Sequence, residues 1–162
     1  MVSKNIIMTL SIVAAFTLLN LSTSFALDCP CGYVQDAANY GISDFCRTDI
    51  SPNGYIVSIN PNTIQQLPKP LQEFFLTHEC AHVCLNHPIR LANTHPNIKT
   101  STNIHFEFEA DCYAVQNTPS PRLSCNAIVT YFNQFGCNRP NINYPRYCDR
   151  VAKIIQCCQQ HN

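Results

Sequence analysis

The chain has 162 residues, and its 10 Lys plus Arg balance its 10 Asp plus Glu, so the formal net charge is zero. It has no cluster or stripe of basic residues, which argues against a nucleic-acid partner. Only 12% of the residues are charged, so any local gathering of acidic residues is informative.

The first 26 residues predict a secretory signal peptide. Lys4 is their only charge, residues 6–21 are almost entirely apolar, and Ser24-Phe25-Ala26 forms a small-x-small cleavage pattern. An uncleaved membrane anchor is the alternative, because the apolar run is only slightly short for a bilayer span. We favour cleavage, which leaves residues 27–162 as a single domain without stable membrane insertion, secreted or periplasmic.

Cysteine use supports export. All 11 cysteines follow residue 26, and such a density beside an export signal predicts a disulfide framework in an oxidising compartment. The pairing of the cysteines cannot be deduced from the sequence. Because their number is odd, at least one cysteine either keeps a free thiol or pairs with a cysteine of another chain.

Prolines and turn residues divide the chain into predicted elements. Residues 33–40 favour a short helix, and residues 55–59 favour a strand between two turns. Residues 70–87 form a helix with apolar residues and histidines at three- and four-residue steps, which Pro88 ends. Residues 89–103 are polar and typical of a loop.

Three more helices follow. The first covers residues 104–117, the second begins at a Ser120 cap with Pro121 and ends at Gly136, and the third covers residues 145–159. The sum is a mostly helical, disulfide-rich α+β domain with a small β-sheet.

The string His78-Glu79-Cys80-Ala81-His82 matches H-E-x-x-H. On a helix, residues four apart share a face, so both imidazoles can reach one metal ion. Glu79 is rotated by about 100° from His78, where its carboxylate can reach a metal-bound water instead. Two core histidines beside a surface glutamate are the alternative interpretation.

A catalytic zinc needs a third protein ligand. The metzincin pattern fails because Leu85 and Pro88 stand where it requires Gly and His. Glu107 is the candidate, with Asp111 on the same helical face as hydrogen-bond acceptor for a ligand histidine. His105 is its rival, and a solvated acidic helix is the alternative for the whole segment. Glu109 is expected to point into solvent.

The two strings together resemble the gluzincin metallopeptidases, especially the HtpX-like and CAAX-prenyl-endopeptidase-like group. The second string, Glu107-x-x-Ala110-Asp111, follows the first motif. Further along the chain, Tyr144-Pro145 and Arg150-Val151 have the same spacing as the His-Pro-x-x-x-x-Arg-Ile string of that group. The resemblance implies a minimal zincin-like domain that hydrolyses peptide bonds with Zn²⁺. It implies His78, His82 and Glu107 as ligands, Glu79 as general base and Asp111 as outer partner. The membrane helices of that group are absent, the two motifs lie closer together, and Tyr144 replaces a histidine.

The expected substrate is a protein or peptide. Tyr144 is the candidate oxyanion donor, with Tyr147 or Arg150 behind it, and the strand at residues 55–59 could pair with an extended substrate. Tyr144 and this strand could equally be structural.

The remaining candidates have simpler expectations. His87 should help to end the first motif helix, and His95 and His161 should be solvated. Cys80 should be a core or disulfide residue or an inhibitory thiol ligand, and a bridge from Cys84 to Cys112 would lock the two motif helices together.

Two other functions remain open. One is a cysteine-rich binding or inhibitor module with a structural zinc, and the other is a zinc amidase acting on cell-wall material. A structural site would need neither Glu79 nor Asp111 and would normally close with four ligands.

Overall fold

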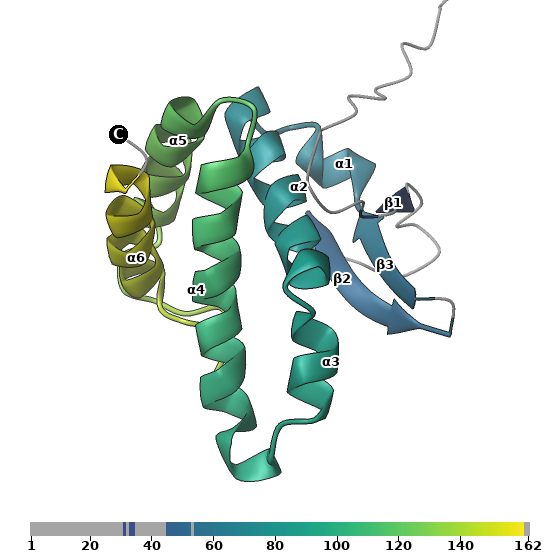
Figure 1. The fold of residues 1–162 in the computed structure, drawn as a ribbon. Coiled ribbons are helices and arrows are strands. Elements are labelled where there is room, and N and C mark those ends of the chain that lie inside the picture. Colours follow the sequence, from purple (N-terminus) through teal and green to yellow (C-terminus); the bar gives the residue numbers. More distant parts are fainter. Residues whose placement is uncertain (1–30, 32, 35–44, 53, 161–162) are drawn as a thin grey trace, which may run out of the picture.

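The structure is a computed structural model that describes residues 31, 33–34, 45–52 and 54–160. The predicted signal peptide, residues 1–26, lies outside these residues. The described chain is mostly helical with a small sheet, as the sequence predicted (Figure 1). Its elements are β1 (Tyr33–Val34), β2 (Cys46–Ser51), β3 (Gly54–Ile59), α1 (Pro61–Ile64), α2 (Lys69–Cys84), α3 (His87–Ala92), η2 (Pro96–Ile98), α4 (Lys99–Asn117), α5 (Pro121–Asn133) and α6 (Tyr147–Gln159).

The sheet has the strand order β1-β3-β2. β2 and β3 form an antiparallel hairpin in which Ser51 pairs with Gly54, whose φ of +117° suits glycine. β3 confirms the predicted strand, whereas β2 has a polar sequence without clear alternation and was not predicted. The helix expected at residues 33–40 is wrong at Tyr33–Val34, which pair in parallel with β3; the rest of that range is not described.

α2 carries the first motif and ends earlier than predicted. Its buried face includes Leu71, Phe74 and His78, as the three- and four-residue spacing indicated. The helix ends at Cys84, and Asn86 then adopts the left-handed conformation with φ 59°. Pro88 does not end α2; it lies in the first turn of α3, where its missing N–H costs no hydrogen bond.

The segment expected to be a loop, residues 89–103, is largely helical. It contains most of α3, the short η2 and the first turn of α4. The prediction failed because most of these residues are exposed and therefore lack an apolar stripe. The result is that α3 and the start of α4 form a pair of helices beside the motif (Figure 1).

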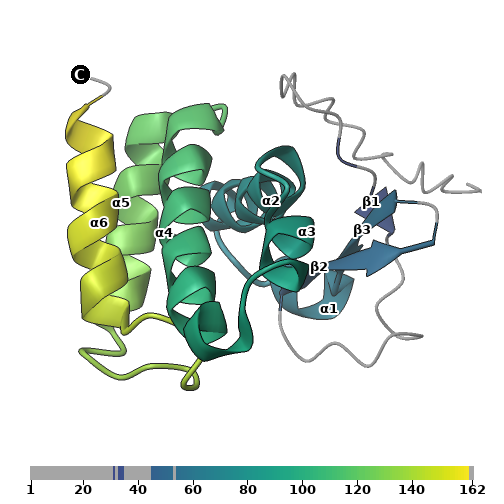
Figure 2. The ribbon, with the colours of Figure 1, turned by 60° about the horizontal axis from the view of Figure 1, so that its bottom comes forward.

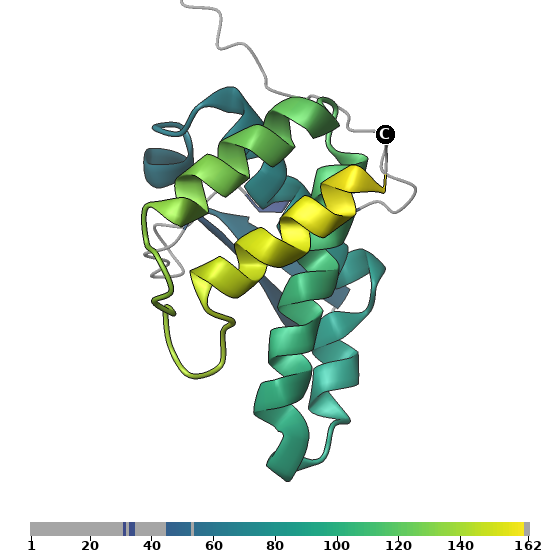
Figure 3. The same ribbon diagram turned by 90° about the vertical axis from the view of Figure 1, so that its left-hand side faces the viewer.

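The core lies between α2, α4, α5 and α6, on the side of α2 away from the sheet (Figures 2 and 3). Phe74, Ile128, Phe132 and Ile154 are almost completely buried there. α5 begins at Pro121 as predicted, but the Ser120 side chain makes no capping hydrogen bond. Gly136, with φ 58°, follows the helix end that the sequence indicated.

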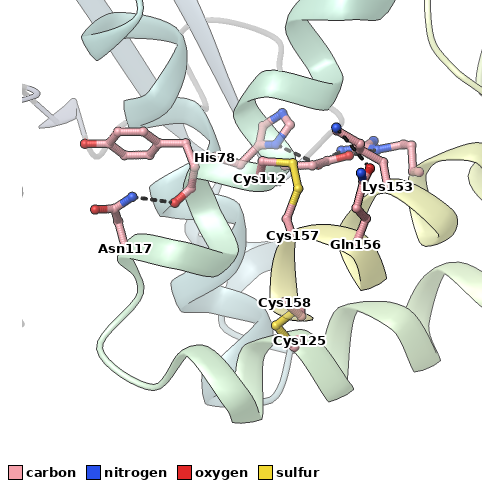
Figure 4. Close-up of a disulfide and its surroundings, with 11 residues drawn as sticks. His78, Cys112, Asn117, Cys125, Lys153, Gln156, Cys157 and Cys158 are labelled. Atoms are coloured by element: carbon pink, nitrogen blue, oxygen red, sulfur yellow. Dashed lines mark hydrogen bonds and ion pairs between the residues drawn. A yellow bond between two sulfur atoms is a disulfide. The ribbon is translucent and has the colours of Figure 1, made fainter. Parts of the chain in front are cut away.

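Four disulfides lie wholly within the described residues, and they confirm the predicted disulfide-rich character. They join Cys31 to Cys80, Cys112 to Cys157, Cys125 to Cys158 and Cys137 to Cys148. Figure 4 shows how the adjacent Cys157 and Cys158 of α6 reach two different helices, α4 and α5. Because Cys112 pairs with Cys157, the bridge considered from Cys84 to Cys112 is wrong. No helix among the described residues is long and apolar enough to cross a membrane.

Candidate metal site

The site forms where α2 and α4 pack side by side (Figure 1). Each helix contributes two residues at a four-residue spacing: His78 and His82 from α2, and Glu107 and Asp111 from α4. Four-residue spacing places both members of each pair on one helical face. The two faces meet, so residues far apart in the sequence become neighbours.

Three of these side chains converge on one point. Nε2 of His78 lies 3.1 Å from Nε2 of His82, and the Glu107 carboxylate lies 3.4 Å from the former and 3.6 Å from the latter. His78 and Glu107 are buried, and His82 is partly buried. All three ligand atoms lie within 4.8 Å of one another, so the group could hold a metal ion.

The charges around this point favour a cation. Burial alone would lower the pKa of His78, but the carboxylates of Asp111 and Glu107 outweigh it and raise the pKa to about 10. Burial would raise the pKa of Glu107, yet the neighbouring His78, His82 and Arg150 lower it to about 2. For His82, burial and the charge on His78 lower the pKa to about 3.

Asp111 takes the place predicted for it, behind His78. Its Oδ1 lies 3.0 Å from Nδ1 of His78, although this buried nitrogen has no aligned hydrogen bond within the described part of the chain. The two groups therefore interact by charge at short range, and a small rotation of the imidazole would align them.

Arg150 holds Asp111 from the other side. Its Nε and Nη2 donate to the two carboxylate oxygens at 2.8 and 2.6 Å, and its guanidinium lies 4.4 Å above the Phe132 ring. Burial would raise the pKa of Asp111, but Arg150 keeps it below its usual value. Arg150 is thus committed to this ion pair, and the sequence had considered it only as an oxyanion donor.

Glu79 lies beside the three converging side chains without belonging to them. Its Oε2 and its main-chain oxygen are 2.7 and 2.9 Å from the Thr48 hydroxyl on β2. Burial raises the pKa of Glu79 above its usual value. Thr48 was not singled out from the sequence, because β2 itself was not predicted.

A pocket of about 200 Å³ connects these groups. Its wall includes Glu79, the two histidines, Glu107 and Tyr144, together with Thr48 from β2 and Phe106 from α4. Tyr144, the candidate oxyanion donor, therefore lines the pocket. Its substitutes do not: Tyr147 stacks on Phe135 with ring centroids 4.6 Å apart, and Arg150 is paired with Asp111.

Three other expectations need correction. His105, the rival third ligand, is exposed and lies outside the converging group, with Nε2 3.4 Å from Glu109. Glu109 does not simply point into solvent, since it also contacts His87 and Arg90 at 3.0 and 3.2 Å. His87 does not end α2; it is buried at the start of α3. His95 is exposed as expected, and His161 lies outside the described residues.

The donor set fits a divalent cation. Two imidazole nitrogens and one carboxylate oxygen match the three protein ligands of several catalytic zinc sites. Nε2 of His78 and Nε2 of His82 lie 3.1 Å apart, so a cation could take the place of a proton shared between them. Comparisons with protein-family models, curated proteins and solved structures found no match to this chain.

Proposed function

We propose that the chain is a zinc-dependent metallopeptidase of the gluzincin type. The supporting observation is the convergence of His78, His82 and Glu107 beside a fourth group, Glu79, that shares their pocket but not their meeting point. The alternative of two core histidines explains neither the buried Glu107 nor the pocket.

The number of ligands favours catalysis over a structural site. Structural zinc is nearly always enclosed by four protein ligands, whereas catalytic zinc keeps a position open for solvent or substrate. In the described residues the converging group has three members and opens on a pocket. Glu79 and the Asp111–Arg150 pair are further features that a structural site would not need.

In the proposed reaction, zinc held by the three ligands would act as a Lewis acid and lower the pKa of water. Glu79 takes a proton from the attacking water and later gives it to the leaving amine nitrogen. Thr48 restrains the Glu79 carboxylate on the sheet side of the pocket. Tyr144 donates its phenolic hydrogen to the oxygen that becomes negative.

The substrate is proposed to be an extended peptide that lies along β2. The sequence had suggested the strand at residues 55–59, but β3 is the central strand and pairs with β1 and β2 on its two sides. β2 is one of the two edge strands of the described sheet, and its Arg47 and Thr48 line the pocket. A peptide paired with such an edge would place its backbone next to Glu79.

The disulfides support a secreted or periplasmic location. Four bridges in a domain of this size are typical of proteins that fold in an oxidising compartment. The signal peptide predicted from residues 1–26 agrees with this proposal.

The test is to purify the chain, measure bound zinc, and compare wild type with Glu79→Gln on casein and on cell-wall peptides. We expect one zinc per chain in both proteins and a loss of peptidase activity of at least about 100-fold in the variant. Glu73→Gln is the matched control, because Glu73 lies on the same helix but outside the pocket.

Each contrary result has a separate meaning. Full activity of Glu79→Gln with its zinc in place would refute the assigned mechanism. Stoichiometric zinc without hydrolysis of any substrate would favour a binding module, and cleavage of the cell-wall substrates alone would favour an amidase.

A further inference from the structure

The second ring nitrogen of His82, Nδ1, makes a contact that has no part in the proposed function. Its Nε2 faces His78 and Glu107, whereas its Nδ1 lies 2.9 Å from Nδ1 of His87. The outer ring nitrogen of His78 contacts a carboxylate, that of Asp111. The outer ring nitrogen of His82 instead contacts another histidine, His87, at 2.9 Å.

The proton positions in this chain of contacts are determined from its far end. Nε2 of His87 lies 3.0 Å from Oε2 of Glu109, and a carboxylate oxygen can only accept. The proton of neutral His87 is therefore on Nε2, which leaves Nδ1 to accept from Nδ1–H of His82. The proton of His82 is then held on Nδ1, and its Nε2 lone pair faces the site.

Packing fixes His87 in this orientation. The side chain is 3% exposed, and its ring stacks on Phe106 with centroids 4.3 Å apart and planes 6° apart. Arg90 also packs on the Phe106 ring, with its guanidinium 4.4 Å from the ring centroid. The same guanidinium lies 3.2 Å from the Glu109 carboxylate. Asn86, in the left-handed conformation, turns the chain so that His87 faces back toward α2.

We infer that His87 and Glu109 are positioning residues for His82, holding its ring and its tautomer so that Nε2 can bind the metal ion. This inference rests on the proposed metal site. It gives His87 and Glu109 the role toward His82 that Asp111 has toward His78. The two ligand histidines are thus supported differently, one by a buried ion pair and one by a histidine–carboxylate pair that reaches the surface. A histidine that served only to fill space against Phe106 would have no effect on metal binding beyond its effect on folding.

The experiment measures the zinc dissociation constant by competition with a chelator, the melting temperature of the metal-free protein, and the visible spectrum of the Co²⁺-substituted protein. His87→Phe keeps a stacking ring but removes both nitrogens, and His87→Gln restores one acceptor and one donor. Glu109→Gln keeps the shape of the partly exposed carboxylate and removes its charge. His95→Gln is the control, because His95 is exposed and lies outside the pocket.

We expect His87→Phe to weaken zinc binding by about 10- to 100-fold, the usual loss when the outer partner of a ligand histidine is removed. Its cobalt spectrum should change, His87→Gln should recover most of the affinity, and Glu109→Gln should show a smaller loss. If His87→Phe does not fold, Glu109→Gln and His87→Gln decide the matter.

Zinc affinity and cobalt spectrum equal to wild type in His87→Phe and Glu109→Gln would overturn the inference while leaving the metal site intact. A loss that only follows the lower melting temperature, without recovery in His87→Gln, would also overturn it. Failure of the wild type to bind zinc would refute the metal site and this inference together. A wild type that binds zinc without hydrolysing peptides would refute only the proposed activity.

Discussion

At the scale of single residues, the site is a row of alternating charges. Arg150 contacts Asp111, Asp111 faces His78, and His78 faces Glu107. Each member sets the protonation of its neighbours, because the surrounding protein excludes water and screens these charges poorly. Binding of a metal ion at the end of such a row would therefore be coupled to proton release.

Zinc binding should release about one proton near neutral pH. With a pKa of about 10, His78 carries a proton that must leave, whereas Glu107 and His82, with pKa values of about 2 and about 3, have already lost theirs. The apparent affinity should rise by about tenfold per pH unit between about pH 6 and about pH 8. Calorimetry in buffers of different ionisation enthalpy counts the proton, and an affinity that does not change with pH would show that His78 is neutral before binding.

Replacing Arg150 by Met should destabilise the fold by about 3–5 kcal/mol, because Asp111 would lose both hydrogen bonds from the guanidinium and only His78 would remain to offset its buried charge. Both side chains are almost completely buried, 8% and 0% exposed, so solvent cannot compensate. The free energy of unfolding in urea measures the loss. Arg146→Met is the control, since Arg146 pairs with Asp149 on the surface and should change stability little. Equal effects of the two substitutions would contradict this account.

At the scale of elements, the parts predicted well are those whose local signals agree with their packing. α2 and α4 each have an apolar face and a pair of site residues four positions apart, so His78, His82, Glu107 and Asp111 could be chosen from the sequence. The parts that were missed depend on distant partners. β1 exists because β3 offers it an edge, and the role of Thr48 depends on β2 lying against α2.

α3 shows the same limitation at a helix boundary. A proline after a helix usually ends it, but here the left-handed Asn86 precedes Pro88 and allows a new helix to start. His87 therefore became a buried contact of His82 instead of an exposed helix end. No spacing rule connects residues 82 and 87 with 109, so this group could be found only in three dimensions.

The turn between α2 and α3 should be sensitive to side-chain shape at position 86. Asn86→Val should cost about 1–2 kcal/mol, because a β-branched residue is strained at positive φ, whereas Asn86→Gly should cost less. Both variants lose the contact of Asn86 with the Tyr55 hydroxyl, so their difference isolates the backbone effect. Thermal unfolding measures it, and a valine variant as stable as the glycine variant would refute the role of this turn.

At the scale of the whole molecule, the disulfides tie the helical layer together. Cys112–Cys157 and Cys125–Cys158 attach α6 to α4 and α5, so the helix that carries Arg150 is fixed against the helix that carries Asp111 (Figure 4). The geometry of the site is thus maintained by covalent bonds outside it.

Removing the Cys112–Cys157 bridge by a double alanine substitution should cost more than removing Cys137–Cys148. The sequence separations are 45 and 11 residues, and loop-closure entropy gives about 4 and about 3 kcal/mol for the two. Denaturant unfolding of both variants provides the comparison. A larger loss for the shorter loop would show that effects other than chain entropy dominate.

The bridge between Cys31 and Cys80 has a consequence for how the proposed metal site would be loaded. Cys80 is next to Glu79, and as a free thiolate it would attract soft ions such as copper(I) more strongly than the imidazoles do. Once oxidised, this sulfur is no longer available for coordination. Oxidation before the proposed site is loaded would therefore remove Cys80 as a competing ligand.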